Sequence, residues 1–153
     1  MYKVLKEFHF IYDASGVGPR DRWPVKDSYG VWHIPLSHVY LGENRVPSIS
    51  MDYNLWMTES RATEEAVKGT PLWNKYYDEV VASYMDYFNS NFNGNRAPVI
   101  IANHFNKWND GVYLEAMKTL AENVCGRTFV RCVTFKELAE YLNTAEVSHL
   151  AGK

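Results

Sequence analysis

Asp52 and His104 are the two side chains whose types and positions predict chemistry. His104 follows the apolar run APVIIAN and precedes FNKWNDG, so it lies where a predicted strand gives way to a predicted helix. Asp52 lies between apolar residues in SISMDYNLW, where a carboxylate is either solvated near a strand end or paired. Side by side, the aspartate would orient the imidazole and favour its charged form, which gives a general acid for a leaving group. The alternative is two unrelated polar residues at strand ends.

The other histidines give weaker signals. His33 and His38 flank Pro35, so they would face one metal ion only if the fold happened to bring them together. The sequence has no HExxH motif, Gly-rich phosphate loop, Ser-centred elbow or CxxC pair. The remaining histidines are His9 and His149.

The two cysteines, Cys125 and Cys132, do not have the spacing of a zinc ribbon. They predict either a disulfide between a helix end and the following strand or two buried free thiols. Because both alternatives stay open, the cysteines do not indicate a cellular compartment.

The first half of the chain, residues 1–72, predicts short and irregular elements. MYKVLKEF is typical of the end of a helix, and FHFIYD of a short strand. VWHIPLSHVYL predicts a strand that stops early because it contains Pro35. RVPSISMDYNLW predicts another strand, which ends in polar and aromatic residues.

The second half, residues 73–145, shows regular spacing. Apolar residues from Tyr77 to Phe88 predict a helix face, and NFNGN ends it. APVIIANHF predicts a strand buried on both faces, because apolar and polar residues barely alternate. A helix follows, with Asn109 or Asp110 as its cap and Gly126 as its stop.

A second strand and a last helix complete this half. TFVRCV predicts the strand. Thr134 and Glu137 form a capping-box pattern before a helix that buries Leu138, Tyr141 and Leu142. The order strand, helix, strand, helix implies parallel strands in an α/β fold, with chemistry at the C-terminal ends of the strands. His104 lies at such an end.

Composition narrows the classes of function. The 153 residues predict one domain, with residues 144–153 as a frayed tail. A net charge of −2 argues against a nucleic-acid binder, and no apolar run is long enough for a membrane span. The first residues, MYKVLKEFHFIYD, do not form a signal peptide. Aromatic residues make up 15% of the chain, and we expect them either to fill a core or to line a groove for sugars or partners.

The segment NRAPVIIANHFNKWNDGVYLEAMKTLAENVCGRTFVRCVTFKELAEYL resembles the C-terminal part of polysaccharide deacetylases of the NodB-homology type. IYDAS, VWHIPL and SISMDYNLW resemble the preceding segments of the same proteins, in the same order. The resemblance covers roughly residues 2–143. It implies part of a distorted (β/α) barrel with a C-terminal strand-helix-strand-helix unit.

The resemblance also implies a hydrolase of carbohydrate metabolism that removes N- or O-acetyl groups from a polysaccharide or oligosaccharide. In the complete family enzyme a divalent metal, often zinc, is held by an aspartate and two histidines, and a second aspartate acts as base. His104 matches the histidine that protonates the leaving group. Asp52, with Trp56 nearby, matches the motif whose aspartate tunes that histidine, and Trp108 would border the sugar groove.

The chain departs from the family in its metal-binding motifs. The family's metal-binding aspartate, its HxxxH and its arginine motif all precede the segments matched here, and no HxxxH occurs in residues 1–153. The family's late histidine also usually has Leu two residues before it, where this chain has Ala102. We therefore expect the C-terminal half of a deacetylase barrel that binds no catalytic metal tightly by itself.

Three explanations follow from this expectation. The chain is a fragment of a full enzyme, which we favour, or one piece of a barrel that another chain completes. The third is a non-catalytic module that binds glycan or takes part in assembly. Half a barrel exposes strand edges, which predicts self-association or a complementing chain. The family's substrates suggest a periplasmic or extracellular location; which glycan it would be is not readable from the residues.

Overall fold

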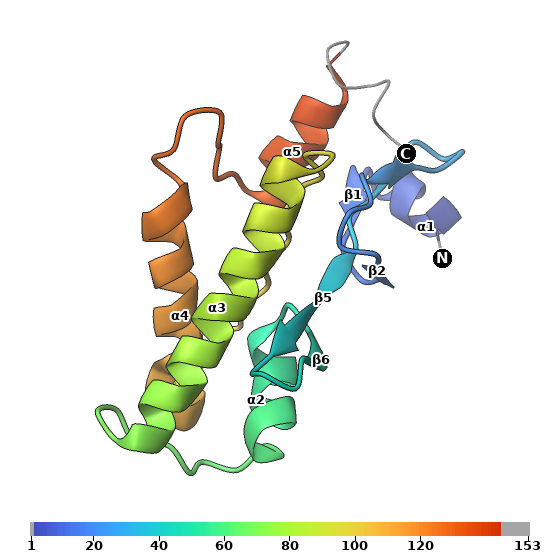
Figure 1. Ribbon diagram of the computed structural model, residues 1–153. Helices are drawn as coiled ribbons and strands as arrows, with labels where there is room; N and C mark the ends of the chain where they lie inside the picture. The colour runs from blue at the N-terminus through green and yellow to red at the C-terminus, as the bar shows by residue number, and fades with distance from the viewer. Residues whose placement is uncertain (1, 145–153) are drawn as a thin grey trace.

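The computed structural model describes residues 2–144 and places a layer of helices beside two small sheets (Figure 1). The elements, in chain order, are α1 (Tyr2–Glu7), β1 (Tyr12–Asp13), β2 (Val17–Gly18), β3 (Val25–Lys26), β4 (Trp32–His33), β5 (Leu36–Leu41), β6 (Val46–Ile49), α2 (Asp52–Ser60), α3 (Pro71–Asn93), α4 (Trp108–Val124) and α5 (Phe135–Leu142).

The two sheets have three strands each and mix parallel with antiparallel pairs. One has the order β1-β4-β3 and the other β2-β5-β6. Strands β5 and β6 form an antiparallel hairpin in which Val39 pairs with Ser48, while β2 runs parallel to β5. Within residues 2–144 these sheets stay small and do not close into a barrel.

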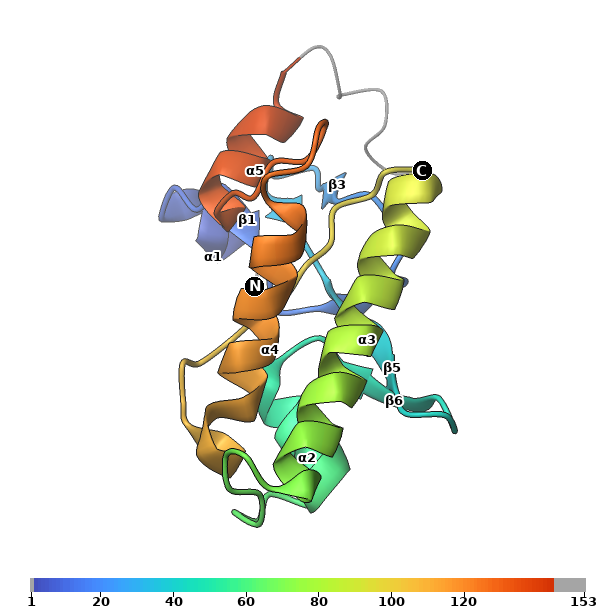
Figure 2. The same ribbon diagram turned by 60° about the vertical axis from the view of Figure 1, so that its left-hand side comes forward.

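Helices α3 and α4 pack side by side and build the larger core (Figure 2). The face predicted for α3 is buried at Val80, Tyr84 and Phe88. Thr70 caps this helix, because its hydroxyl accepts a hydrogen bond from the backbone N–H of Trp73 at 3.3 Å. This core therefore holds together the helices that frame the extended segment leading to His104.

A second core lies between the sheets and α5. Ile100 and Ala97 of the extended segment pack there with Trp32, Ile34 and Leu36. The capping box of α5 is confirmed, since Thr134 and Glu137 exchange both hydrogen bonds. The face of α5 differs in one position from the prediction: Leu138, Ala139 and Leu142 are buried, but Tyr141 is exposed.

Three strand predictions differ from the structure. Residues 97–103 are extended but pair only through one parallel bridge, between Met51 and Ala102. The strand that contains Val46 ends at Ile49, and Asp52 already begins a helix. Residues 128–133 form no strand.

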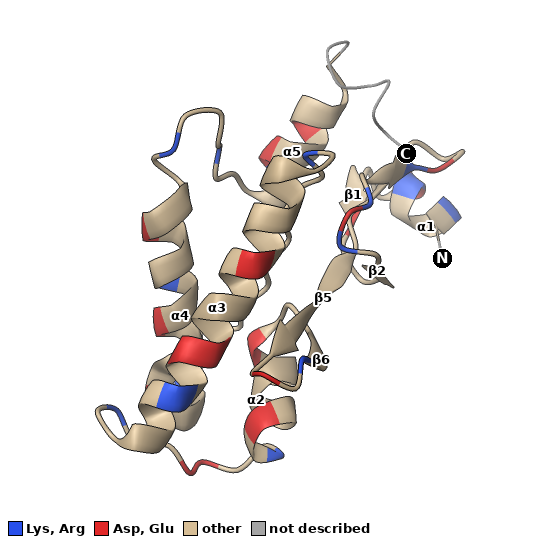
Figure 3. Ribbon diagram, viewed as in Figure 1, with Lys and Arg blue, Asp and Glu red and all other residues tan. Residues whose placement is uncertain are grey.

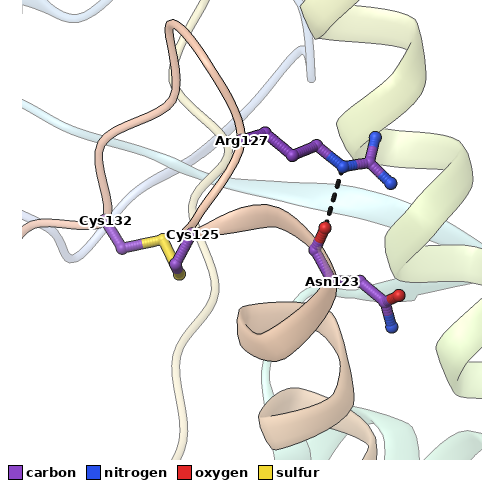
Figure 4. The surroundings of a disulfide bond; sticks show 4 residues. All are labelled: Asn123, Cys125, Arg127 and Cys132. Atoms are coloured by element: carbon purple, nitrogen blue, oxygen red, sulfur yellow. Dashed lines mark hydrogen bonds between the residues drawn. A yellow bond between two sulfur atoms is a disulfide. The ribbon is translucent and has the colours of Figure 1, made fainter.

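A disulfide between Cys125 and Cys132 accounts for the missing strand (Figure 4). It joins the end of α4 to the following segment, with the two Cα atoms 5.4 Å apart. Residues 128–133 instead run as a loop that returns Cys132 to the end of α4, where the bond holds it. The same loop is braced by Arg127, whose Nε donates to the backbone oxygen of Asn123 at 2.8 Å.

The charged side chains do not gather by sign. Figure 3 shows Lys and Arg positions scattered over several elements, with acidic positions among them. Among residues 2–144, no helix combines the length and the apolar character needed to cross a membrane.

Glu59, in the last turn of α2, has a buried carboxyl group that lacks hydrogen bonds from the described residues. Neither of its carboxyl oxygens, nor the hydroxyl of Tyr84, has a hydrogen-bond partner among the described residues. Burial, with a smaller contribution from the nearby charge of Glu79, raises the pKa of Glu59 from 4.5 to about 8. Glu59 is therefore mostly neutral at pH 7, which spares the core a buried charge.

Replacing Glu59 by glutamine should stabilise the protein in a pH-dependent way. Between the ordinary pKa of 4.5 and the folded value of about 8, the unfolded chain ionises Glu59 while the folded chain does not. Folding stability therefore falls as pH rises through this window, by on the order of 3–5 kcal/mol. Urea unfolding should show that the advantage of Glu59→Gln grows from about pH 5 to about pH 8. The exposed Glu122→Gln is the control, and an equal effect of Glu59→Gln at both pH values would contradict the assignment.

The disulfide should stabilise the fold measurably. Its sequence separation of 7 residues closes a short loop, for which chain entropy gives about 2.5 kcal/mol. The double variant Cys125→Ser/Cys132→Ser should lose about this much in urea unfolding. Reductant should lower the wild-type midpoint to that of the double variant and leave the variant unchanged. A wild-type midpoint that ignores reductant would argue against the bond.

Candidate functional site

Asp52 and His104 lie in direct contact, although 52 residues separate them in sequence. The imidazole Nδ1 donates to Asp52 Oδ1 at 2.6 Å, because a carboxylate can only accept. The backbone N–H of His104 donates to Asp52 Oδ2 at 2.8 Å. One carboxylate thus holds both the ring and the backbone of the histidine, which fixes the direction of the ring.

The start of α2 supports the negative charge of Asp52. This carboxylate is only 1% exposed, and Oδ1 also accepts the backbone N–H of Tyr53 at 2.8 Å. Asp52 lies in the first turn of the helix, where free N–H groups and the helix dipole favour an anion. The buried charge is therefore satisfied by three donors and by its position.

The backbone brings the two residues together through a short parallel contact. Ala102 donates its N–H to the oxygen of Ser50 at 2.9 Å, and Asp52 donates to the oxygen of Ala102 at 3.3 Å. Ser50 is fully buried, and its hydroxyl donates to the Ile100 oxygen at 2.7 Å while it accepts from the backbone of Ser37. This register places His104 beside Asp52, the first residue of α2.

Aromatic side chains lie on one side of the histidine. Trp56 and Trp108 stack with their ring centres 4.8 Å apart and their planes within 6°. Tyr53 meets both edge-on, and Trp108 meets the His104 ring edge-on at 5.8 Å. The Trp56 indole N–H is held by the backbone oxygen of Thr63 at 3.1 Å. Tyr53, Trp56 and Trp108 are called the aromatic cluster below.

Asn109 fixes the turn that carries Trp108. Its buried side chain accepts from the backbone N–H of Glu65 at 2.9 Å and donates to Ser60 Oγ and Tyr113 Oη, each at 3.1 Å. The prediction that Asn109 or Asp110 caps α4 is wrong. Both residues have left-handed backbone angles, and their side chains bind the backbone of the loop after α2 instead.

The free nitrogen of His104 gives the site its chemistry. Asp52 occupies Nδ1, whereas Nε2 has no hydrogen-bond partner among the described residues and the side chain is 52% exposed. An imidazolium held in this way presents one acidic N–H outward. The arrangement can protonate a leaving oxygen or nitrogen, or accept a proton after release.

The structure brings together all four residues that the sequence singled out: Asp52, His104, Trp56 and Trp108. Sequence reasoning missed Tyr53 as a member of the aromatic cluster. Its position directly after Asp52 was the available signal. Ser50 gave no signal and Asn109 was expected only as a helix cap, because the roles of both buried residues depend on contacts made across the fold.

Of the other histidines, His33 lies on β4, His38 lies on β5, and His149 lies outside the described residues. His33 lies between two carboxylates, with Nε2 3.1 Å from Asp27 and Nδ1 3.4 Å from Asp13. His38 is exposed on β5. Among residues 2–144, no group of three or more His, Cys, Asp or Glu side chains is arranged to hold a metal ion.

Comparison of the chain with models of protein families, with curated proteins and with solved structures finds no match.

Replacing Asp52 by asparagine should release the histidine. An amide can place its NH₂ group against the N–H donors of His104, so a buried donor loses its acceptor at a cost of about 1–3 kcal/mol. Proton NMR should show a downfield Nδ1 proton resonance in the wild type that is absent from Asp52→Asn, together with a lower urea midpoint. The exposed Asp78→Asn is the matched control and should change neither. Retention of the downfield resonance in Asp52→Asn would sink this account of the pair.

Proposed function

We propose that this chain carries the proton-donating part of a glycan deacetylase site, in which acetyl groups are hydrolysed from a polysaccharide or oligosaccharide. The observation that supports the proposal is the Asp52–His104 pair, whose free Nε2 lies beside the aromatic cluster. Aromatic rings suit the apolar faces of sugars. The resemblance of the chain to polysaccharide deacetylases assigns this pair the same task.

The chemistry is hydrolysis of an amide or an ester. Water adds to the acetyl carbon, and the tetrahedral intermediate then loses the sugar nitrogen or oxygen. As the C–N or C–O bond breaks, His104 Nε2–H gives its proton to the departing atom, which leaves as an amine or an alcohol with acetate as the other product. Asp52 holds the imidazole through Nδ1, so the positive charge stays compensated until the proton has left.

The described residues do not fit the metal that the resemblance implies. Asp52 is committed to His104, and no other His, Cys, Asp or Glu group in residues 2–144 is arranged for a metal ion. A divalent metal such as zinc, and the general base, would then need ligands from outside the described residues, either elsewhere in a longer protein, in a complementing chain or in a second copy. We therefore assign to this chain the donor and the sugar platform alone.

A non-catalytic glycan-binding or assembly module is the second candidate. The aromatic cluster favours it, because Trp56 and Trp108 are positioned by Thr63 and Asn109 rather than by His104. Such a platform can hold a sugar without any proton transfer.

The disulfide supports a location outside the reducing cytosol. Disulfides persist in the periplasm and the extracellular space, and Cys125 and Cys132 are paired here. These are also the compartments where acetylated polysaccharides are exposed to enzymes.

Replacing His104 by alanine should separate the two candidates. Acetate release from acetylated chito- and xylo-oligosaccharides would be measured with added zinc over a range of protein concentrations, because a self-associated site gains activity with concentration. In the enzymatic case His104→Ala lowers the rate about 100-fold or more and leaves glycan affinity within about threefold.

The exposed His38→Ala is the control and should keep the wild-type rate. Glycan binding without acetate release in every variant supports the binding module. Release that is indifferent to His104→Ala, or a wild type that binds no glycan, contradicts the proposed function.

A further inference from the structure

Phe105, the residue after His104, is exposed and has an unfavourable backbone conformation. Its φ is 59°, in the left-handed region that bulky residues rarely adopt. Its side chain remains 70% exposed and joins neither core. The fold therefore gains no packing from this phenylalanine, although it is held in a strained turn.

Hydrogen bonds fix the turn at Phe105. The backbone N–H of Phe105 donates to Asn103 Oδ1 at 2.6 Å, and the next N–H back along the chain, that of His104, is bound by Asp52. Hydrogen bonds on two consecutive residues thus set the position of Phe105 relative to the imidazole. Strained residues that are held in this way cluster at binding and catalytic sites.

Phe105 is also separate from the aromatic cluster. It makes no ring contact with Tyr53, Trp56 or Trp108 among the described residues, whereas Trp108 lies 5.8 Å from the His104 ring. Consecutive Cα atoms are about 3.8 Å apart, so Phe105 still lies next to the proton donor. An exposed phenyl side chain that does not belong to the cluster therefore follows the proton donor directly in the chain.

We propose that Phe105 is a specificity-determining residue that contacts a second sugar ring, next to the ring that rests on the aromatic cluster. The inference rests on the proposed function and deepens it: it names the residue that would contact the second ring of the polysaccharide or oligosaccharide. A single ring occupies the cluster alone, and a longer chain reaches Phe105 as well.

Phe129 provides a matched control within the same chain. It is also a phenylalanine with left-handed backbone, φ 64°, and it is 87% exposed. It follows the C-terminal end of α4, whereas His104 precedes the N-terminal end. The 17 residues of α4 separate the two by roughly 25 Å. Phe129→Ala thus removes the same exposed ring far from the site.

Calorimetric titration with N-acetylglucosamine and its β-1,4-linked dimer and tetramer tests the inference on the full chain. Wild type and Phe129→Ala should bind the dimer and tetramer more tightly than the monomer. Phe105→Ala should lose about 3- to 10-fold in affinity for the dimer and tetramer, the range of one stacking contact, and keep its affinity for the monomer. Phe105→Trp should restore the dependence on length. Thermal unfolding of each variant verifies that it is folded.

The possible failures are distinguishable. If the wild type binds the sugars but Phe105→Ala keeps the wild-type dependence on length, this inference is overturned and the proposed function stands. The same holds if the wild type binds monomer and tetramer equally, or if Phe129→Ala loses as much as Phe105→Ala. If the wild type binds none of the sugars, the proposed function fails and takes this inference with it.

Discussion

The structure around the site depends on the burial of one carboxylate. Asp52 is almost inaccessible to solvent, and an isolated charge in that position would oppose folding. The cost is offset because the backbone N–H of Tyr53, the backbone N–H of His104 and the imidazole all point at it. Any movement of the segment before His104 would remove two of these donors. The hydrogen bonds that orient His104 are therefore the same ones that make the burial of Asp52 compatible with folding.

The same helix shows what happens without such donors. Glu59 lies seven residues after Asp52 on α2, and it too is buried, but its two carboxyl oxygens have no hydrogen-bond partner among the described residues. The first turn of a helix offers free N–H groups and a favourable dipole, while the last turn offers neither to an anion. The helix start therefore supplies Asp52 with hydrogen-bond donors, whereas burial without donors raises the pKa of Glu59 to about 8. Two buried carboxyl groups on one helix thus differ in their hydrogen bonds because one lies in the first turn and the other in the last.

Sequence reasoning reached the site because its two charged members lie at predictable places. An apolar run that ends in a histidine marks a strand end, and a lone acid between apolar residues needs a partner. The helices α3, α4 and α5 follow from apolar spacing, and a capping box marks the start of α5. The failures arose where distant contacts override local preference. The disulfide keeps 128–133 from extending, and Asn109 takes a left-handed conformation because its side chain satisfies the backbone of another loop.

The site also separates two tasks that the proposed deacetylation would require. Proton donation needs a histidine with one nitrogen bound and one free, and positioning a sugar needs an apolar platform beside it. Both are present, on elements that two cores hold in place. Activation of water needs metal ligands or a base at the opposite side of the acetyl carbon, and the described residues contain no arranged group of this kind. In the proposed deacetylation a donor acts only after water has added, so His104 would set which atom leaves and the aromatic cluster which sugar is held. The groups that activate water would then approach across the exposed face of His104.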